Sequence, residues 1–181
     1  MKTLIVLSHP TFDTSVVNRA LVAELKKTPD IFTIHHLESR YPTGAIDVPT
    51  EQALVEAHEK LVLQFPLYWF NCPPMLKKWL DEVLTHNWAY GSQGDKLRGR
   101  KVALAVTAGI DAQEYAASGK YGYQLEEILR PFQMTLTYCQ AAYKSFFAFY
   151  GAERANETDD HAYASRVAQS AKNYAEFIKN M

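Results

Sequence analysis

Short apolar runs alternate with segments of helical periodicity along the whole chain, and this alternation limits the folds that the sequence can adopt. The strongest runs are rich in Leu, Val, Ile and Ala, as is typical of parallel strands that are covered on both faces. We predict five strands, at Thr3–Leu7, Phe32–Leu37, Leu61–Phe65, Val102–Thr107 and Thr135–Tyr138. Strands that alternate with helices indicate βαβ units. We therefore expect an α/β fold: a flavodoxin-like, doubly wound, five-stranded parallel sheet in the order 2-1-3-4-5, with helices on both faces.

The segments between the predicted strands carry apolar side chains at helical spacing. The stripes are Val17, Leu21 and Leu25; Ala53, Leu54, Ala57 and Leu61; Met75, Leu76, Trp79, Leu80, Val83 and Leu84; and Leu125, Ile128, Leu129 and Phe132, interrupted by Pro131. We predict a last helix with Thr158 as its N-cap, which buries Tyr163, Val167, Ala171, Tyr174 and Phe177/Ile178. Since no repeat or linker interrupts this pattern, residues 1–181 are expected to form a single flavodoxin-like domain.

The charge and cysteine content exclude several classes of function. A net charge of -1 and a pI near 6.6 give no electrostatic footprint for nucleic acid or for an acidic membrane surface. Cys72 and Cys139 lack CxxC spacing and the histidines lack metal-ligand spacing, so we expect neither a disulfide framework nor a metal site. The first apolar run is too short for a signal peptide, and we expect a cytoplasmic protein.

The loop after the first predicted strand, residues 8–18, is a candidate phosphate site. It contains neither a dinucleotide fingerprint nor a P-loop. It is rich in hydroxyl and amide groups at a helix start, where backbone N–H groups with Thr14, Ser15 and Asn18 could hold a phosphate without Lys or Arg. His9 could add a donor. An ordinary capped helix start, with His9 satisfied locally, explains the same residues equally well.

Two further loops follow the third and fourth predicted strands. Pro66-Leu67-Tyr68-Trp69-Phe70 could wall a flat conjugated ring, although taken alone it fits a hydrophobic plug over the sheet edge better. Thr107-Ala108-Gly109-Ile110-Asp111 could bring backbone amides close to a ligand, or be an ordinary turn. The three loops follow strands that are neighbours in the flavodoxin-like order, so they should meet at one edge of the sheet. Together they favour binding of a mononucleotide with a fused-ring head.

Several short segments, in chain order, carry a family resemblance. They are Ser8-His9-Pro10 with Ser15 and Asn18, Gln64 to Phe70, Pro73-Pro74-Met75-Leu76-Lys77, His86-Asn87-Trp88-Ala89-Tyr90-Gly91, Thr107-Ala108-Gly109 and Leu129-Arg130-Pro131-Phe132-Gln133. In these segments the chain resembles the flavodoxin-fold NAD(P)H:quinone oxidoreductase family. It is most similar to the small bacterial branch that includes the ancillary flavoproteins of glutathione-gated potassium-efflux systems.

The resemblance implies a bound flavin, with FMN favoured over FAD. His9 and the run Ser15, Val16, Val17 and Asn18 would hold its phosphate. Pro66, Leu67, Tyr68, Trp69 and Phe70 would line its ring, and Thr107, Ala108, Gly109 and Ile110 its pyrimidine edge. The family also implies a homodimer with the flavin at the interface, where Trp88-Ala89-Tyr90 would reach the partner's pocket.

Two departures from the family pattern affect the candidate catalytic residues, which are Tyr115, Tyr121 and Gly109. Where the family turn often reads Thr-Thr-Gly-Gly, this chain has Ala108 and Ile110. Where the quinone reductases place a Tyr and a His, it has two tyrosines, which cannot act as cations. Stabilisation of the reduced flavin should therefore rest more on the backbone amides of Gly109 and Ile110.

The implied activity is transfer of a hydride from NAD(P)H through the flavin to a quinone or a similar flat acceptor, two electrons at a time. Three alternatives stay open. The chain could be a regulatory flavoprotein that docks on a membrane potassium-efflux transporter, a one-electron carrier of the flavodoxin type, or a structural α/β module. No pair of basic residues is clearly placed to bind the 2′-phosphate of NADPH, so the sequence does not indicate whether NADH or NADPH is preferred.

Overall fold

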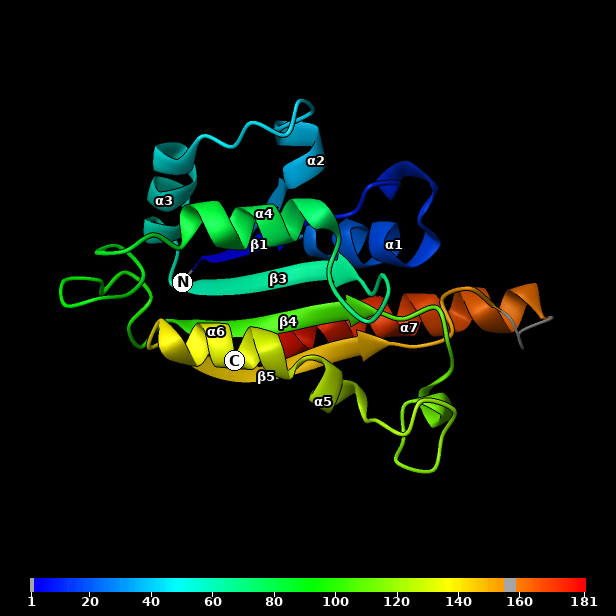
Figure 1. The fold of residues 1–181 in the computed structure, drawn as a ribbon. Coiled ribbons are helices and arrows are strands. Elements are labelled where there is room, and N and C mark those ends of the chain that lie inside the picture. The colour runs from blue at the N-terminus through cyan, green and yellow to red at the C-terminus, as the bar shows by residue number, and fades with distance from the viewer. Residues whose placement is uncertain (1, 155–158) are drawn as a thin grey trace.

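The fold is built on one parallel sheet with the strand order β2-β1-β3-β4-β5, as the computed structural model shows (Figure 1). The structure describes residues 2–154 and 159–181. The strands are β1 (Thr3–Leu7), β2 (Phe32–His36), β3 (Lys60–Pro66), β4 (Lys101–Thr107) and β5 (Ala142–Phe149). In register, Thr3 of β1 lies beside Phe32 of β2 on one side and Lys60 of β3 on the other. The predicted fold class and strand order are confirmed.

Helices cover both faces of this sheet. They are α1 (Val16–Leu25), α2 (Leu37–Arg40), α3 (Val48–Glu56), α4 (Pro74–Val83), α5 (Leu125–Ile128), α6 (Arg130–Tyr138) and α7 (Asp160–Lys179), with short 3-10 helices at Phe12–Thr14 and Ala112–Glu114. In Figure 1, α4 and α6 lie in front of the sheet, while α1 and α7 lie behind it. Because side chains alternate along a strand, Leu4 and Val6 join the core under α4, whereas Ile5 joins the core under α1 and α7.

The predicted fifth strand is wrong. Residues Thr135–Tyr138 lie in α6, and the strand follows it at Ala142–Phe149. The run Thr135–Tyr138 has a strand-like composition, but Phe132 and Leu136 are buried on the same face of the helix, and this packing decides its conformation. Pro131 is tolerated at the start of α6, so the interrupted stripe at 125–132 forms two helices, α5 and α6.

One strand boundary and one helical stripe differ from the prediction. Leu37 begins α2 instead of ending β2. The helical stripe predicted to reach Leu61 ends earlier, because α3 ends at Glu56, and Leu61 lies in β3, where the strand prediction also put it. Thr158, the predicted N-cap of the last helix, lies outside the described residues. The described N-cap is Asp159, whose carboxylate accepts hydrogen bonds from the backbone N–H groups of His161 and Ala162.

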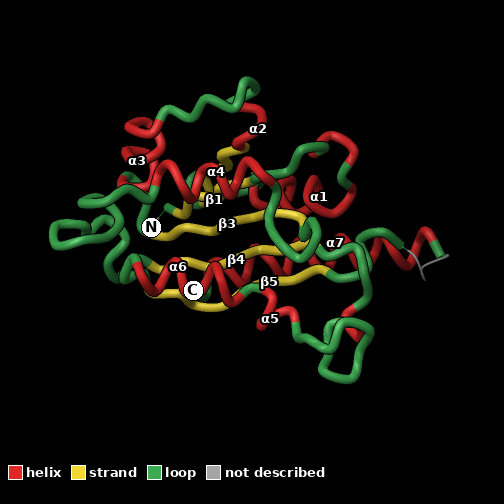
Figure 2. The backbone as a smooth tube through the Cα atoms, in the orientation of Figure 1, coloured by secondary structure: helices red, strands yellow, loops and turns green. Residues whose placement is uncertain are grey.

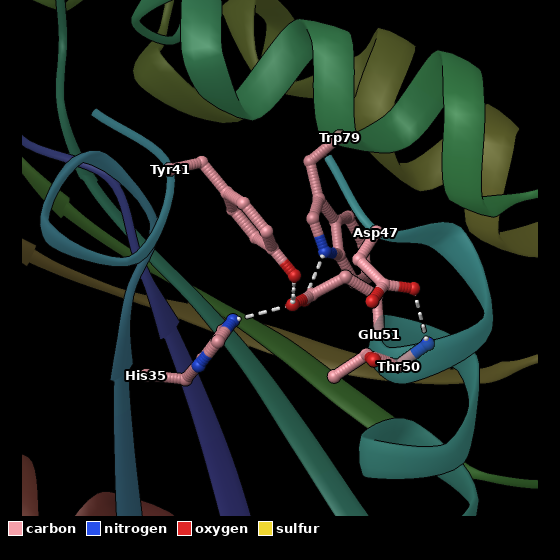
Figure 3. A network of polar contacts seen from close by, with 6 residues as sticks. All are labelled: His35, Tyr41, Asp47, Thr50, Glu51 and Trp79. Carbon is pink, nitrogen blue, oxygen red and sulfur yellow. Dashed lines mark hydrogen bonds and ion pairs between the residues drawn. The ribbon is translucent and has the colours of Figure 1, made fainter. Parts of the chain in front are cut away.

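A buried carboxylate joins the elements on one side of the sheet (Figure 3). Glu51 of α3 is fully buried and accepts three hydrogen bonds. Its Oε1 lies 2.8 Å from Nε2 of His35 and 2.5 Å from the hydroxyl of Tyr41, and its Oε2 lies 2.7 Å from the indole nitrogen of Trp79. These partners come from β2, the end of α2 and α4. One carboxylate therefore ties four elements together.

The stability contributed by Glu51 should depend on pH. Burial by itself raises the pKa of this carboxyl, but the hydrogen bonds from His35, Tyr41 and Trp79 lower it below its ordinary value. A carboxyl with a lowered folded-state pKa stabilises the fold fully above its unfolded pKa of about 4.3, and this contribution is lost as the pH falls through the folded value. We expect the stability difference between the wild-type protein and Glu51→Ala to be constant from pH 7 to pH 5 and to shrink below pH 4. Urea unfolding curves across this range measure it, and a difference that grows on acidification would contradict the assignment.

Across residues 2–154 and 159–181, no helix combines the length and the apolar character needed to cross a membrane.

Candidate functional site

Three loops leave the sheet at the carboxyl ends of neighbouring strands, as predicted (Figure 2). They follow β1, β3 and β4. Two adjoining cavities lie among them: a deep cavity of about 320 Å³ and an aromatic cavity of about 290 Å³. Leu67, Gly109 and Glu153 line both cavities. Together they form one elongated site at the edge where open α/β sheets bind ligands.

The deep cavity is lined by both polar and apolar side chains, and the first loop contributes several of the polar ones. The predicted phosphate-binding residues are all among its lining. The full lining is His9, Thr11, Thr14, Ser15, Val16, Val17, Asn18, Pro66, Leu67, Tyr68, Thr107, Gly109, Ala152, Glu153, Arg154 and Tyr163.

His9 is held in one orientation by its neighbours. Its Nδ1 accepts a hydrogen bond from the backbone N–H of Thr11 at 3.2 Å, so the ring proton of the neutral histidine lies on Nε2. The Glu38 carboxylate accepts from the backbone N–H of His9 at 3.0 Å and from the Ser8 hydroxyl at 2.6 Å. Burial lowers the pKa of His9, which keeps its ring neutral. His9 therefore brings a fixed N–H donor to the lining of the deep cavity.

The start of α1 forms the second group of donors. Ser15 is the N-cap, and its Oγ accepts from the backbone N–H of Asn18 at 3.2 Å. The capped turn proposed as an alternative is thus present, and it is part of the cavity lining. A helix N-terminus presents unpaired N–H groups and the positive end of the helix dipole, which favour an anion.

A cation also lines the deep cavity, contrary to the expectation of a site without Lys or Arg. The guanidinium of Arg154 lies 4.7 Å from the ring centroid of Tyr163, and it pairs with Asp160. Residues 151–153 are fixed beside the third loop by backbone hydrogen bonds, from Ala152 N to Ala108 O at 2.9 Å and from Glu153 N to Gly109 O at 3.2 Å. This segment follows β5 at Ala142–Phe149, so the predicted strand at Thr135–Tyr138 gave no indication that it lies beside the site.

The aromatic cavity brings together the three candidate catalytic residues and part of the predicted ring-binding loop, whereas Pro66 and Tyr68 of that loop line the deep cavity. The aromatic cavity is lined by Leu67, Trp69, Phe70, Gly109, Ile110, Tyr115, Tyr121 and Glu153. The rings of Phe70 and Tyr121 meet edge to face with centroids 4.9 Å apart, and those of Tyr115 and Tyr121 are 5.6 Å apart. Burial raises the pKa of Tyr115 to about 12, so this phenol stays protonated and can donate a hydrogen bond.

The aromatic loop does not plug the sheet edge. Trp69 is 94% exposed, and a plug would bury it. Trp69 and Phe70 both have left-handed backbones, with φ of 48° and 61°. A tight turn holds them there, because the backbone N–H groups of Tyr68 and Asn71 each donate to the other's carbonyl at 2.8 Å and 2.9 Å. This turn holds two aromatic side chains at the rim of the aromatic cavity, at a cost in backbone strain.

Two predicted residues of the third loop differ in position. Ala108 is fully buried behind the lining, where its backbone N–H donates to Phe149 O at 2.8 Å. Gly109 lines both cavities, and a Cβ there would meet the side chain of Glu153, which is exposed. The segment at 151–153 therefore lies directly against the third loop.

The loop at Trp88-Ala89-Tyr90 lies far from both cavities. It follows α4 at the amino ends of the strands, in the green loop at the left of Figure 1. Trp88 is anchored there, since its indole nitrogen donates to Glu56 at 2.7 Å. The loop therefore lines neither cavity of its own chain.

Comparisons with known proteins agree with this architecture. The chain matches the model of a family described as "Flavodoxin-like fold" over residues 1–174. It is similar to an uncharacterised NAD(P)H oxidoreductase, YrkL, of Bacillus subtilis, with 41% identity over 179 residues that cover 99% of this chain and 98% of the relative. It is also 34% identical to KefG of Escherichia coli, an ancillary protein of the glutathione-regulated potassium-efflux system, over 99% of this chain and 93% of the relative.

Two solved structures are close in fold. General stress protein 14 of Treponema denticola, crystallised in complex with FMN, has 46% identity and a TM-score of 0.93, with 99% of each chain covered. An NADPH-quinone reductase of P. pentosaceus has 26% identity and a TM-score of 0.82, over 97% of this chain and 98% of that one. The resemblance drawn from the loop residues is thereby confirmed, and the chain belongs to the flavodoxin-like-fold family whose members include NAD(P)H oxidoreductases and KefG.

Proposed function

We propose that this protein is an FMN-dependent NAD(P)H oxidoreductase that reduces quinones or similar flat acceptors by two electrons. The observation that carries the proposal is the division of one site into a donor-rich deep cavity and an adjoining aromatic cavity. A mononucleotide with a fused-ring head needs this combination. The FMN complex of the Treponema denticola relative supports FMN as the ligand, in preference to FAD.

The residues present fit this cofactor. His9, the Ser15 hydroxyl, the N–H groups of Val16 and Val17 and the Arg154 guanidinium would hold the phosphate at the end of the deep cavity. Leu67 and Tyr68, which line the same cavity near the aromatic loop, would contact the ring.

When bound, FMN would supply the hydride and electron chemistry. The protein's part is to position the reactants. Trp69 and Phe70 would stack on a flat donor or acceptor in the aromatic cavity, and the phenols of Tyr115 and Tyr121 would donate hydrogen bonds to its oxygens. The backbone amides of Gly109 and Ile110 would stabilise negative charge at the pyrimidine edge of the ring.

Initial-rate kinetics test this function. If donor and acceptor use the aromatic cavity in turn, double-reciprocal plots at several acceptor concentrations should be parallel, as in a ping-pong mechanism. Intersecting lines that require a ternary complex would contradict it. Menadione is a suitable flat acceptor, and NADH and NADPH should be compared.

Replacing Trp69 with alanine should impair turnover with little effect on the fold. The side chain is almost fully exposed, so its removal costs little packing, whereas a lost stacking partner costs about 1 kcal/mol or more. We expect kcat/KM for NAD(P)H to fall at least about fivefold, with a melting temperature near that of the wild type. Tyr123→Ala is the matched control, because Tyr123 is an exposed aromatic residue that lines neither cavity. Equal effects of the two variants would contradict the role of Trp69.

We further propose that the active form is a homodimer that pairs through α6. Met134 and Tyr138 of this helix are exposed large apolar residues, and they line a shallow apolar cavity with Arg130, Gln133 and Thr137. The ring of Tyr138 lies 5.3 Å from that of Tyr90, in the loop expected to reach the partner's pocket. Sedimentation velocity should give a dimer that Met134→Asp dissociates. A wild-type monomer would overturn this proposal.

A second candidate function is regulation of a potassium-efflux system, which the 34% identity to KefG favours. In that role the flavoprotein would dock on a membrane transporter. Co-purification with a potassium-efflux transporter from the same organism would support it. Full oxidoreductase activity without any effect on efflux would count against it.

A further inference from the structure

A series of hydrogen-bonded buried side chains, here called the buried chain, runs behind the deep cavity from α7 to the start of α1. The hydroxyl of Tyr174 donates to Oε1 of Gln64 at 3.0 Å, and Nε2 of Gln64 donates to Oδ1 of Asn18 at 3.1 Å. Nδ2 of Asn18 then faces Oγ1 of Thr107 at 2.9 Å and Oγ of Ser15 at 3.4 Å. Tyr174, Gln64, Asn18 and Thr107 are between 0% and 4% exposed, so water does not complete these bonds.

The hydroxyl of Tyr174 decides which group donates and which accepts in each hydrogen bond of the buried chain. Within the described part of the sequence, the hydroxyl has Gln64 as its one hydrogen-bond partner. Suppose that the side-chain amides of Gln64 and Asn18 were both flipped, so that oxygen and nitrogen exchanged places. Gln64 would then donate to the hydroxyl of Tyr174, and the hydroxyl hydrogen would be buried without an acceptor, which is unfavourable. Complete burial also raises the pKa of Tyr174 well above its ordinary value, so the hydroxyl keeps its proton. The phenol therefore turns the carbonyl of Gln64 toward itself.

These donor and acceptor roles fix the orientation of two hydroxyl groups at the cavity, those of Ser15 and Thr107. Since Asn18 presents its NH2 group to Ser15 and Thr107, both hydroxyl oxygens act as acceptors toward it. Ser15 Oγ accepts a second hydrogen bond from the backbone N–H of Asn18. Their own hydrogens must then point elsewhere, and both residues line the deep cavity. With the amides reversed, these hydrogens would be donated to Asn18 and lost to a ligand.

We propose that Tyr174 and Gln64 are positioning residues for the anion site, which hold the hydroxyl hydrogens of Ser15 and Thr107 toward the deep cavity. The inference rests on the proposed function, because it takes the anion to be the FMN phosphate. It predicts that Tyr174, which lies at the end of the buried chain away from the ligand, affects binding of the phosphate without touching it.

The test compares FMN with riboflavin, which lacks the phosphate, as ligands of the flavin-free protein. Their Kd values are measured by quenching of flavin fluorescence for the wild type and for Tyr174→Phe. We expect the Kd for FMN to rise about tenfold, equivalent to about 1.4 kcal/mol, and the Kd for riboflavin to change by less than about threefold. A merely structural role of Tyr174 would weaken both ligands equally.

Two further variants complete the test. Tyr41→Phe is the matched control, since it removes a buried phenol that donates to Glu51, away from the cavities, and it should leave the ratio of the two Kd values unchanged. Gln64→Met breaks the chain at the next link and should lower the preference for FMN as Tyr174→Phe does, which decides the matter if the tyrosine variant does not fold. Folded variants that keep the wild-type ratio would overturn the inference alone. Wild-type protein that binds FMN no better than riboflavin would overturn it together with the proposed phosphate site.

Discussion

Glu51→Ala is expected to lower the free energy of unfolding by about 3–5 kcal/mol, the range seen when one partner of a buried charged network is removed. The substitution leaves the Tyr41 hydroxyl, the Trp79 indole N–H and the His35 ring without their common acceptor, inside the protein. These groups hold β2, α2, α3 and α4 together, so the loss is not confined to one helix. Urea unfolding followed by tryptophan fluorescence measures it.

Glu56→Ala is the control for this experiment. Glu56 lies in the same helix and also accepts a hydrogen bond from an indole, that of Trp88 at 2.7 Å, but it is exposed to solvent. Water can replace an exposed carboxylate, so we expect a loss of about 1 kcal/mol or less. Similar losses for Glu51→Ala and Glu56→Ala would contradict the importance assigned to the buried network.

Ser15→Asp is expected to raise the Kd for FMN at least about a hundredfold, equivalent to about 2.7 kcal/mol. Aspartate is as good an N-cap as serine, so α1 should keep its start. The new carboxylate would, however, stand where the phosphate is expected, and like charges brought together in a binding site cost several kcal/mol. Titration of the flavin-free protein with FMN measures the effect, and riboflavin shows whether the loss depends on the phosphate.

Ser15→Asn is the matched variant, because asparagine also caps helices but carries no charge. We expect it to bind FMN within about tenfold of the wild type. If Ser15→Asp kept wild-type affinity for FMN, the phosphate could not lie at the start of α1, and the assignment of the deep cavity would be wrong.

The central strands could be predicted from the sequence because their environment leaves a direct trace in it. β1, β3 and β4 are covered by helices on both faces, so nearly every side chain is apolar. β5 lies at the edge of the sheet, and its exposed Lys144 and Ser145 break the apolar run. The helix before it contains β-branched and aromatic residues, which resemble a strand until tertiary packing is known.

The site was predictable where it depends on topology and not where it depends on tertiary contacts. Loops that follow neighbouring parallel strands must meet at one edge, which is why His9, Trp69 and Gly109 come together as expected. Arg154 follows β5, the strand whose position was predicted wrongly, and no local sequence pattern marks Arg154 as part of the lining.

The hydrogen-bond partners of the buried polar residues also could not be predicted from the sequence. Glu51 occurs in an ordinary helical segment, and Gln64 interrupts an apolar strand without any sign of its role. Their hydrogen bonds join residues that are far apart in the chain, such as Gln64 and Tyr174. Only the folded structure shows that these residues are satisfied by side chains from other elements.

The most direct test of the account is the absorption spectrum of the purified protein, followed by titration of the flavin-free protein with FMN. We predict the absorption bands of a bound flavin, and the flavin released by heat should be FMN. If the cofactor is lost on purification, we predict saturable binding of one FMN per chain, with tighter affinity than for riboflavin. A colourless protein that binds neither FMN nor FAD on titration would contradict the proposal that these two cavities hold a flavin.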